Sequence, residues 1–247
     1  MAPIRKGDGT PLEIPGVSEV RSGDGRVFFE GGVAIPDSAI AHFDASDEST
    51  IITSDGNVVE WHDKLGNYDL TGEALAYESN GINNLPSVEF DGVDNALSAE
   101  FSDPLQQPNT VFTVVQFLDD DLSEFSPFFG SEGDSEHAMI QGDGDGFQRI
   151  DAGEFFRAGD TTNDPLLFTA VFDEADSLIR EDGEETASGD AGSSPLDGLQ
   201  LGAEGGRFSQ HYEGYISAVV PCDGRLSQSD IEEEEQRLAD KWGISLA

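Results

Sequence analysis

Ile82-Asn-Asn-Leu-Pro-Ser-Val-Glu-Phe-Asp-Gly-Val-Asp-Asn-Ala-Leu97 is the segment of the sequence that is most informative about the fold. Apolar residues recur along it, and the pair Asp91–Gly92 stands between them. Glycine reaches a positive φ without the steric penalty that a Cβ imposes, so Asp-Gly is a common chain reversal. The segment therefore predicts a strand, a tight turn and a second strand.

Further strands are predicted on both sides of this segment. Thr110–Phe117 and Leu166–Phe172 are rich in β-branched and aromatic residues, which is typical of strands buried on both faces. Shorter runs between Gly- and Asp-rich turns predict the remaining strands: Ala39–Phe43, Val58–His62, Pro127–Gly130, Ala138–Gln141, Phe147–Ile150, Ser177–Arg180, Leu196–Ala203 and Tyr212–Val220. Many short strands at intervals of about ten residues indicate an all-β sandwich.

Only the C-terminus strongly favours a helix. Ser227 suits the N-cap position, and Gly243 suits the C-terminal stop. The acidic run 232–235 falls in the first turns, where it complements the helix dipole, so we expect a solvated face that needs no partner. Three apolar residues share the face that is expected to pack on the sandwich: Ile231, Leu238 and Trp242.

Four stretches resemble, in the same order, the laminin-G-like and concanavalin A-like jelly rolls. They are His42–Ser46, Trp61–Asn67, Leu85–Leu97, and an ending that runs from Gly214–Ile216 to Leu238–Ile244. The resemblance covers about residues 36–245 and implies an antiparallel jelly-roll sandwich. This family is a scaffold for lectins, adhesion modules and some glycoside hydrolases, so the fold alone leaves the function open.

The charge of the chain restricts its partners. There are 51 Asp and Glu residues against 12 Lys and Arg, which gives a formal net charge of -39. Such a chain repels itself in dilute buffer, whereas at molar salt the Debye length is only about 3 Å. The carboxylates are spread along the chain, so halophilic solvation is favoured over an acidic tail or a cation store. No basic patch is present to release counterions, so neither nucleic acid nor an anionic membrane is an expected partner.

Residues 1–34 are predicted to form an arm, and residues 35–247 the jelly-roll domain. Ile4–Thr10 returns 16 residues later as Val20–Arg26, and each copy carries a Gly-Asp-Gly turn, which predicts two small β-hairpins. About 30 residues cannot bury enough apolar surface to be stable alone. We therefore expect a docking arm that also supports a homo-oligomer. The alternative is that its strands extend the sandwich sheet.

The Gly-Asp-Gly leader is similar to the starts of structural proteins of haloarchaeal tailed viruses. The N-terminus has no apolar signal-peptide core, and no apolar run approaches the length of a membrane span, so we expect neither a signal peptide nor membrane insertion. Assembly inside the cell followed by lysis would reconcile an extracellular type of module with the lack of an export signal.

These observations predict a structural protein on the virion surface, extracellular after lysis, in a high-salt environment. It would be a capsid turret or decoration, or a tail fibre. The arm would dock on other virion proteins, and the lectin-like domain would serve host attachment by carbohydrate binding to surface glycans. A surface lectin or adhesin of the archaeon itself is the alternative.

Three carboxylates approach a catalytic pattern. Glu89, Asp91 and Asp94 resemble the Glu-x-Asp-x-x-Glu of jelly-roll glucanases, in which two carboxylates flank the glycosidic bond. The third side chain is shorter here, and the turn at Asp91 interrupts the strand that would have to present all three. Trp61 and Trp242, the only tryptophans, fit structural positions, so no aromatic sugar cleft is evident. We expect no enzyme, with a glycoside hydrolase as the less favoured alternative.

Acidic loops suggest a metal site. Sandwiches of the resembled family often hold Ca²⁺ with loop carboxylates and carbonyls, which are the oxygen ligands that hard cations need. The resemblance therefore implies Ca²⁺ or another hard cation as the candidate cofactor. None of the clusters has the spacing of a defined calcium loop, and clusters arise by chance in so acidic a chain. The candidate ligands are Asp91, Asp94, Asp143 and Asp145.

Overall fold

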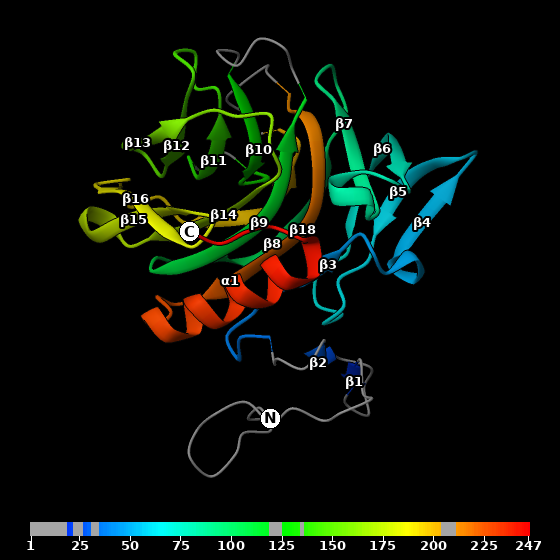
Figure 1. Ribbon diagram of the computed structural model, residues 1–247, viewed down its shortest axis with the longest axis horizontal. Helices are drawn as coiled ribbons and strands as arrows, with labels where there is room; N and C mark the ends of the chain where they lie inside the picture. Colours follow the sequence, from blue (N-terminus) through cyan, green and yellow to red (C-terminus); the bar gives the residue numbers. More distant parts are fainter. Residues whose placement is uncertain (1–18, 22–26, 31–34, 119–124, 134–135, 204–210) are drawn as a thin grey trace.

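The computed structural model describes residues 19–21, 27–30, 35–118, 125–133, 136–203 and 211–247. The described chain is an antiparallel all-β sandwich with one C-terminal helix (Figure 1), which confirms the predicted fold class. Sixteen strands form one continuous sheet that folds over into two layers. Among the described residues, no helix has the length and apolarity needed to cross a lipid bilayer.

The first layer carries the long buried strands and the helix. Its strand order is β16 (Glu184–Gly189), β15 (Ser177–Glu181), β14 (Leu166–Phe172), β9 (Asn109–Phe117), β18 (Glu213–Asp223) and β7 (Ser87–Asp91), with β3 (Phe43–Asp44) also beside β18. The helix α1 (Gln228–Trp242) packs on the outer face of β9 and β14 (Figure 1). Strand β9 is therefore covered by the other layer on one side and by α1 on the other.

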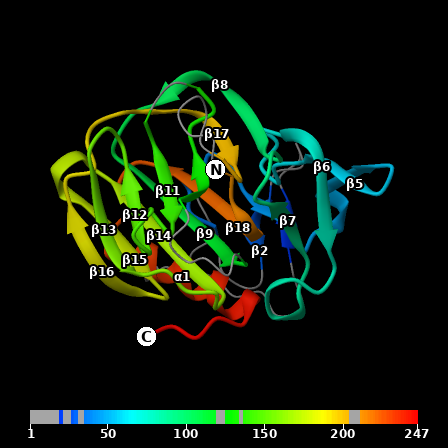
Figure 2. The same ribbon diagram turned by 90° about the horizontal axis from the view of Figure 1, so that it is seen from above.

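The second layer lies over the first (Figure 2). Its strand order is β13 (Phe155–Asp160), β12 (Phe147–Asp151), β11 (Ala138–Gln141), β10 (Ser126–Gly130), β17 (Leu196–Leu201) and β8 (Leu97–Leu105), with β5 (Asn57–Trp61) and β4 (Ile51–Ser54) at the far end. Short 3₁₀ helices occur at η1 (Glu48–Thr50), η2 (Ile82–Asn84) and η3 (Glu174–Asp176).

Strand β6 (Leu70–Glu78) connects the two layers. Its first part pairs with β5 and β8, and its last part, from Ala76, pairs with β7. Ala74 lies between the residues paired with β8 and those paired with β7, and its φ of 61° is uncommon for a residue other than glycine. At the opposite side, the edge strands β13 and β16 approach each other, so the sandwich is nearly closed.

The turn predicted at Asp91–Gly92 is present, but it is not a hairpin turn. The strands that it joins, β7 and β8, pair with β6 in different layers rather than with each other. Gly92 has φ of 72°, and a Cβ there would lie 2.9 Å from the Cβ of Glu213, so the corner needs glycine for both its conformation and its space.

Strands that are buried on both faces are confirmed with almost the predicted bounds, because their composition is continuously apolar. The strands that the sequence pattern missed are the half-exposed ones, whose Thr, Ser, Gly and Glu residues resemble loops: β4, β6, β13, β16 and β8, which begins at Leu97, where the second strand of the opening segment was predicted to end. The predicted strand Ala39–Phe43 is reduced to an isolated bridge from Ala39 to Cys222 and the two residues of β3.

Large aromatic side chains fill the space between the layers. Trp61 and Trp242 are both fully buried, as expected of structural residues. Aromatic contacts run through the interior, including an edge-to-face pair between Phe43 and Trp61 with ring centroids 5.7 Å apart. Buried rings of this kind contribute most of the hydrophobic stabilisation in a sandwich core.

The helix begins and ends where its caps predict, but its acidic run is solvated only in part, since Glu232 is exposed whereas Glu234 and Glu235 are buried. Ser227 Oγ accepts a hydrogen bond from the backbone N–H of Asp230, and Gly243 adopts the left-handed C-cap. Glu234 and Glu235 have only 1% exposed side chains, which corrects the expectation that this run needs no partner. Each carboxylate is paired with a guanidinium instead, since a buried charge needs a partner.

The two guanidiniums come from different places. Arg237, one turn along the helix, donates two hydrogen bonds to Glu234. Arg180 of β15 donates two hydrogen bonds of 2.9 Å to Glu235 and so joins the helix to the sheet. The helix therefore packs through a polar stripe as well as through the predicted apolar face.

In the N-terminal arm, β1 (Glu19–Arg21) and β2 (Val27–Glu30) form an antiparallel pair. The alternative was that the strands of the arm extend the sandwich sheet. Instead, β1 and β2 make a sheet of their own, separate from the described sandwich sheet. The first of the two predicted hairpins lies outside the described residues. Docking of the arm and its boundary at residue 34 stay predictions.

A buried ion cluster ties the C-terminal end of the helix to the sandwich. Lys64 Nζ lies 3.0 Å from Asp44 Oδ2, and both side chains are 1% exposed. Lys241 of the helix is paired with the same oxygen, and Asp47 lies 3.4 Å from Lys64. Burial alone would raise the pKa of Asp44, but Lys241 and Lys64 hold it well below its usual range. The carboxylate is thus ionised in the folded state.

We predict that Asp44→Asn lowers the free energy of unfolding by about 3 kcal/mol, because it removes the buried carboxylate that is paired with both Lys64 and Lys241. Urea denaturation in molar KCl, followed by the fluorescence of the two buried tryptophans, measures this. Asp173→Asn is the matched control, since its pair with Arg225 has side chains 29% and 38% exposed and should be worth less than about 1 kcal/mol. Equal losses in the two variants would contradict the prediction.

Candidate functional site

One buried carboxylate shapes the loop between β5 and β6. Asp63 accepts hydrogen bonds from the backbone N–H groups of Leu65, Asn67 and Tyr68 within the loop, at 2.9, 2.8 and 3.3 Å. It also accepts one of 2.7 Å from the N–H of His42, which precedes β3. Burial raises the pKa of Asp63, although these four donors act to lower it. The carboxylate thereby fixes the loop against the start of the sandwich.

The loop places an aromatic ring against strand β8. The rings of Tyr68 and Phe101 have centroids 4.5 Å apart and planes inclined by 48°. Both residues are half-buried and pack on the edge of the hydrophobic core. Among the described strands, β8 pairs with β6 only at Leu97 and Ser98, so the rest of that edge of β8 faces the loop.

Two hollows share Tyr68 in their lining, and together they form what we call the Tyr68 groove. Both are lined by Ile40 and Tyr68. The first has a volume of about 650 Å³, and its polar lining is Asn67, Glu100 and Ser102. The second has a volume of about 370 Å³, and its lining includes Phe101, Asp103, Gln106 and Asp223. Both volumes fall within the roughly 300–1,000 Å³ of small-ligand sites.

The groove combines a hydrogen-bonding rim with an aromatic face. Asn67 is held in place because its Nδ2 donates a hydrogen bond of 2.8 Å to the carbonyl oxygen of Ile40. Carboxylates accept hydrogen bonds, whereas amides and hydroxyls both donate and accept them. Such a surface suits a ligand with one apolar face and many hydroxyl groups.

The candidate metal ligands are divided between two places. Asp143 and Asp145 lie together, but Arg157 is ion-paired with both of them, at 2.6 Å from Asp145 Oδ2. Asp91 and Asp94 lie in the corner between β7 and β8, where Asp91 Oδ1 accepts the N–H of Val93 at 2.9 Å. In the described part of the chain, no three His, Cys, Asp or Glu side chains are grouped so that they could hold a metal ion. Binding of Ca²⁺ stays a prediction.

The side chains of Glu89, Asp91 and Asp94 do not lie on one face of a single strand. Glu89 and Asp91 share a face of β7, because alternate residues of a strand point the same way, while Asp94 follows in the turn. Burial raises the pKa of Glu89, and the nearby carboxylates of Glu78, Asp91 and Glu213 raise it further. The shift thus comes from partial burial and crowding of like charges. Neither hollow of the Tyr68 groove includes Glu89.

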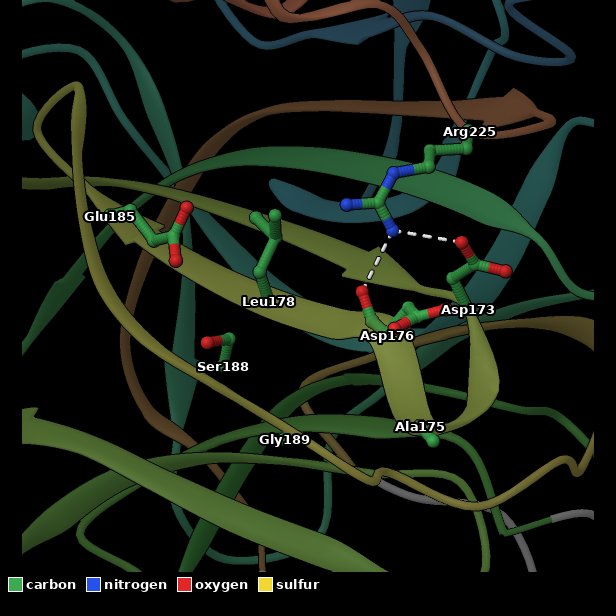
Figure 3. Close-up of a pocket in the computed structure, with 8 residues that line it drawn as sticks. All are labelled: Asp173, Ala175, Asp176, Leu178, Glu185, Ser188, Gly189 and Arg225. Carbon is green, nitrogen blue, oxygen red and sulfur yellow. Dashed lines mark hydrogen bonds and ion pairs between the residues drawn. The ribbon is translucent and has the colours of Figure 1, made fainter.

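A third hollow, of about 560 Å³, lies beside β15 and β16 (Figure 3). Arg225 reaches over it, and its Nη1 donates hydrogen bonds of 2.8 Å to Asp173 and 2.7 Å to the carbonyl oxygen of Asp176. Leu178 and Glu185 line the opposite side. This hollow has no aromatic side chain in its lining, so it offers no flat apolar face to a ligand.

The aromatic pair could not be recognised in the sequence. Tyr68 and Phe101 are separated by more than thirty residues, and each stands in a segment without a known binding motif. The one available signal was the stretch Trp61–Asn67, which directly precedes Tyr68 and was recognised for its resemblance. The structure shows that its Asp63 is what positions the ring.

Comparison with known proteins identifies the type of fold but not a family. No family model matches the chain, and no curated protein matches it. Solved structures do match. Trypanosoma rangeli sialidase has a TM-score of 0.59 and 16% identity over 87% of this chain, which spans only 35% of the sialidase. The binding domain of Paraclostridial Mosquitocidal Protein 1 has a TM-score of 0.60 and 9% identity, over 82% of this chain and 52% of that one.

A third similar structure matches almost end to end. Domain 4 of AbnA, a GH43 extracellular arabinanase from Geobacillus stearothermophilus, in complex with arabinotriose, has a TM-score of 0.56 and 14% identity. The match covers 79% of this chain and 97% of that domain. At such identities the likeness concerns the fold alone: this chain has the β-sandwich that recurs in parts of these glycan-processing and binding proteins.

Proposed function

We propose that the chain is a non-catalytic carbohydrate-binding module and that the Tyr68 groove is its binding site. The observation that carries the proposal is the pair of Tyr68 and Phe101 rings in the lining of a groove that also carries polar side chains. A sugar ring has an apolar face of C–H groups, which packs on an aromatic ring, and an edge of hydroxyl groups, which need donors and acceptors. The groove offers both kinds of contact.

The similar structures add support of a limited kind. One is a domain solved with arabinotriose bound, and another is the binding domain of a toxin. Since one fold serves many functions, these matches raise the expectation of a binding module without naming a ligand. The local chemistry of the groove is what directs the proposal to a carbohydrate.

The proposal includes the biological setting that the sequence predicts. The module would be carried on the surface of a haloarchaeal virus particle, as a turret, decoration or tail fibre, and would attach to host glycans. This setting rests on the leader and on the charge of the chain, and the comparisons do not bear on it. Antibody against residues 35–247 should label virions in a lysed culture, whereas label confined to cell envelopes would favour the archaeal adhesin.

We predict that Tyr68→Ala weakens carbohydrate binding at least about fivefold, since the loss of one aromatic contact costs about 1 kcal/mol. Tyr68→Phe keeps the ring and should keep most of the affinity. A glycan array in molar KCl identifies a ligand, and titration calorimetry gives its dissociation constant for each variant. Arabinotriose is the first soluble probe, with and without added Ca²⁺.

Phe155→Ala is the matched control for this experiment. Phe155 is 49% exposed on β13 and belongs to neither hollow, so its removal should leave the affinity unchanged. If Tyr68→Ala and Phe155→Ala bind like the unaltered protein, the groove is not the binding site. Release of reducing sugar by the protein, lost in Glu89→Gln, would contradict the non-catalytic part of the proposal.

We also predict that Asp63→Asn costs about 2–3 kcal/mol of stability and weakens binding, because an amide nitrogen would then face backbone N–H groups that need an acceptor. Urea denaturation gives the stability, and hydrogen exchange should show faster exchange of the amides in the 63–68 loop. Asp69→Asn is the control in the same loop. It accepts one hydrogen bond, from the N–H of Asp63, which an amide oxygen can also accept.

A further inference from the structure

We infer that the Tyr68 groove selects a neutral oligosaccharide, which occupies the two hollows that Tyr68 lines, and excludes sugars that carry a carboxylate or sulfate. This inference rests on the proposed carbohydrate-binding function and names the class of its ligand. The juxtaposition that carries it is Tyr68, which lines both hollows and packs on Phe101 of the second, together with a charged lining that is entirely acidic.

The charged residues in the lining of the groove are all acidic. Glu100 lines the first hollow, and Asp103 and Asp223 line the second. All three side chains belong to exposed residues, so they face any ligand that enters. Neither lining includes a lysine, arginine or histidine among the described residues. An anionic sugar would therefore bring its charge against carboxylates, with no cation among the described lining residues to pair with.

The rest of the described domain does not supply a cation either. From residue 35 onward, each described lysine and arginine is ion-paired with a carboxylate: Lys64 and Lys241 with Asp44, Arg149 with Asp151, Arg157 with Asp143, Arg180 with Glu235, Arg225 with Asp173, and Arg237 with Glu234. Moving one of these cations to the groove would break its ion pair. High salt weakens the repulsion at long range, but the Debye length of about 3 Å leaves it in force at contact.

Neutral sugars fit the same lining for the opposite reason. A hydroxyl group donates a hydrogen bond, and a carboxylate is a strong acceptor because a charged partner strengthens the bond. Glu100 and Asp103 can each accept from hydroxyl groups, while Ser102 and Gln106 can donate as well as accept. Each hollow thus holds at least one acceptor and one donor besides the aromatic face.

The arrangement of the lining indicates more than one sugar unit. Residues alternate along β8, so that Glu100 and Ser102 line the first hollow while Phe101 and Asp103 line the second. The hollows meet at Ile40 and Tyr68, which line both. A ligand that enters both hollows must reach past these two shared residues, for which an oligosaccharide with a flexible glycosidic linkage is better suited than a single sugar ring.

The first test compares matched sugars on the full chain by titration calorimetry in molar KCl. Lactose is compared with sialyllactose, and galactotriose with trigalacturonate. Binding of the neutral member should be at least about tenfold tighter in each pair. Affinity should also rise about tenfold or more from the monosaccharide to the trisaccharide of a neutral series, and then level off. Equal binding within the pairs, or no gain with length, would overturn the inference.

Charge variants separate a local effect from the net charge of the chain. The double variant Glu100→Gln with Asp103→Asn should reduce the preference for the neutral sugar at least about threefold. Glu184→Gln with Glu185→Gln removes the same charge from β16 and should leave the preference unchanged. If the two double variants change the preference equally, the net charge decides and the groove does not select.

Subsite variants test the second part of the inference. Ser102→Ala alters the first hollow and Gln106→Ala the second, and both residues are exposed, so neither change should affect folding. One variant should weaken both the monosaccharide and the trisaccharide, and the other should weaken the trisaccharide alone. Two variants that weaken both ligands equally would indicate a single subsite.

The failure of this inference is distinguishable from failure of the proposed function. If no neutral or anionic glycan binds, or if binding is insensitive to Tyr68→Ala, the proposed function is wrong and the inference falls with it. If glycans bind in a way that depends on Tyr68 but without preference for neutral sugars, the function stands and only the selectivity is overturned.

Discussion

Two adjacent residues, Asp63 and Lys64, carry the buried charges on which the arrangement of the sandwich edge depends. The carboxylate of Asp63 accepts four backbone N–H groups from the loop and from His42. The ammonium of Lys64 is paired with Asp44, which also holds Lys241 of the helix. Three segments distant in the sequence are therefore fixed through one dipeptide, and the position of Tyr68 follows from it.

The acidic composition has a structural consequence beyond solubility. Because cations are few, the described domain uses its lysines and arginines for pairs with carboxylates, several of them buried under the helix or against β3. The remaining surface is left with carboxylates, which high salt screens. The solvation predicted from the charge and the selectivity proposed for the groove thus have a common origin. In both, the negative charge of the carboxylates is the cause: it predicts a need for salt in the whole chain and repulsion of anions at the groove.

The sequence predicted the fold where local pattern and burial agree. Strand β14 and helix α1 follow from continuous apolar runs and from caps, which act over a few residues. The turn at Asp91 was predicted, but not its role as a corner between layers, because pairing partners are decided by contacts with β6. The burial of Glu234 and Glu235 was missed for a similar reason, since Arg180 lies far away in the sequence.

The candidate site lay beyond prediction for a stronger reason of the same kind. Its aromatic face depends on two tertiary features: the loop conformation that the hydrogen bonds of Asp63 hold, and the edge of β8 that β6 leaves unpaired. Neither feature can be recognised from the residues around Tyr68 or Phe101. The carboxylates that the sequence predicted as site residues lie outside the groove. Asp143 and Asp145 are ion-paired with Arg157, and Glu89 lies near other carboxylates. In a chain this acidic, a carboxylate cluster says little about function, whereas an aromatic pair beside a groove is rare enough to be informative.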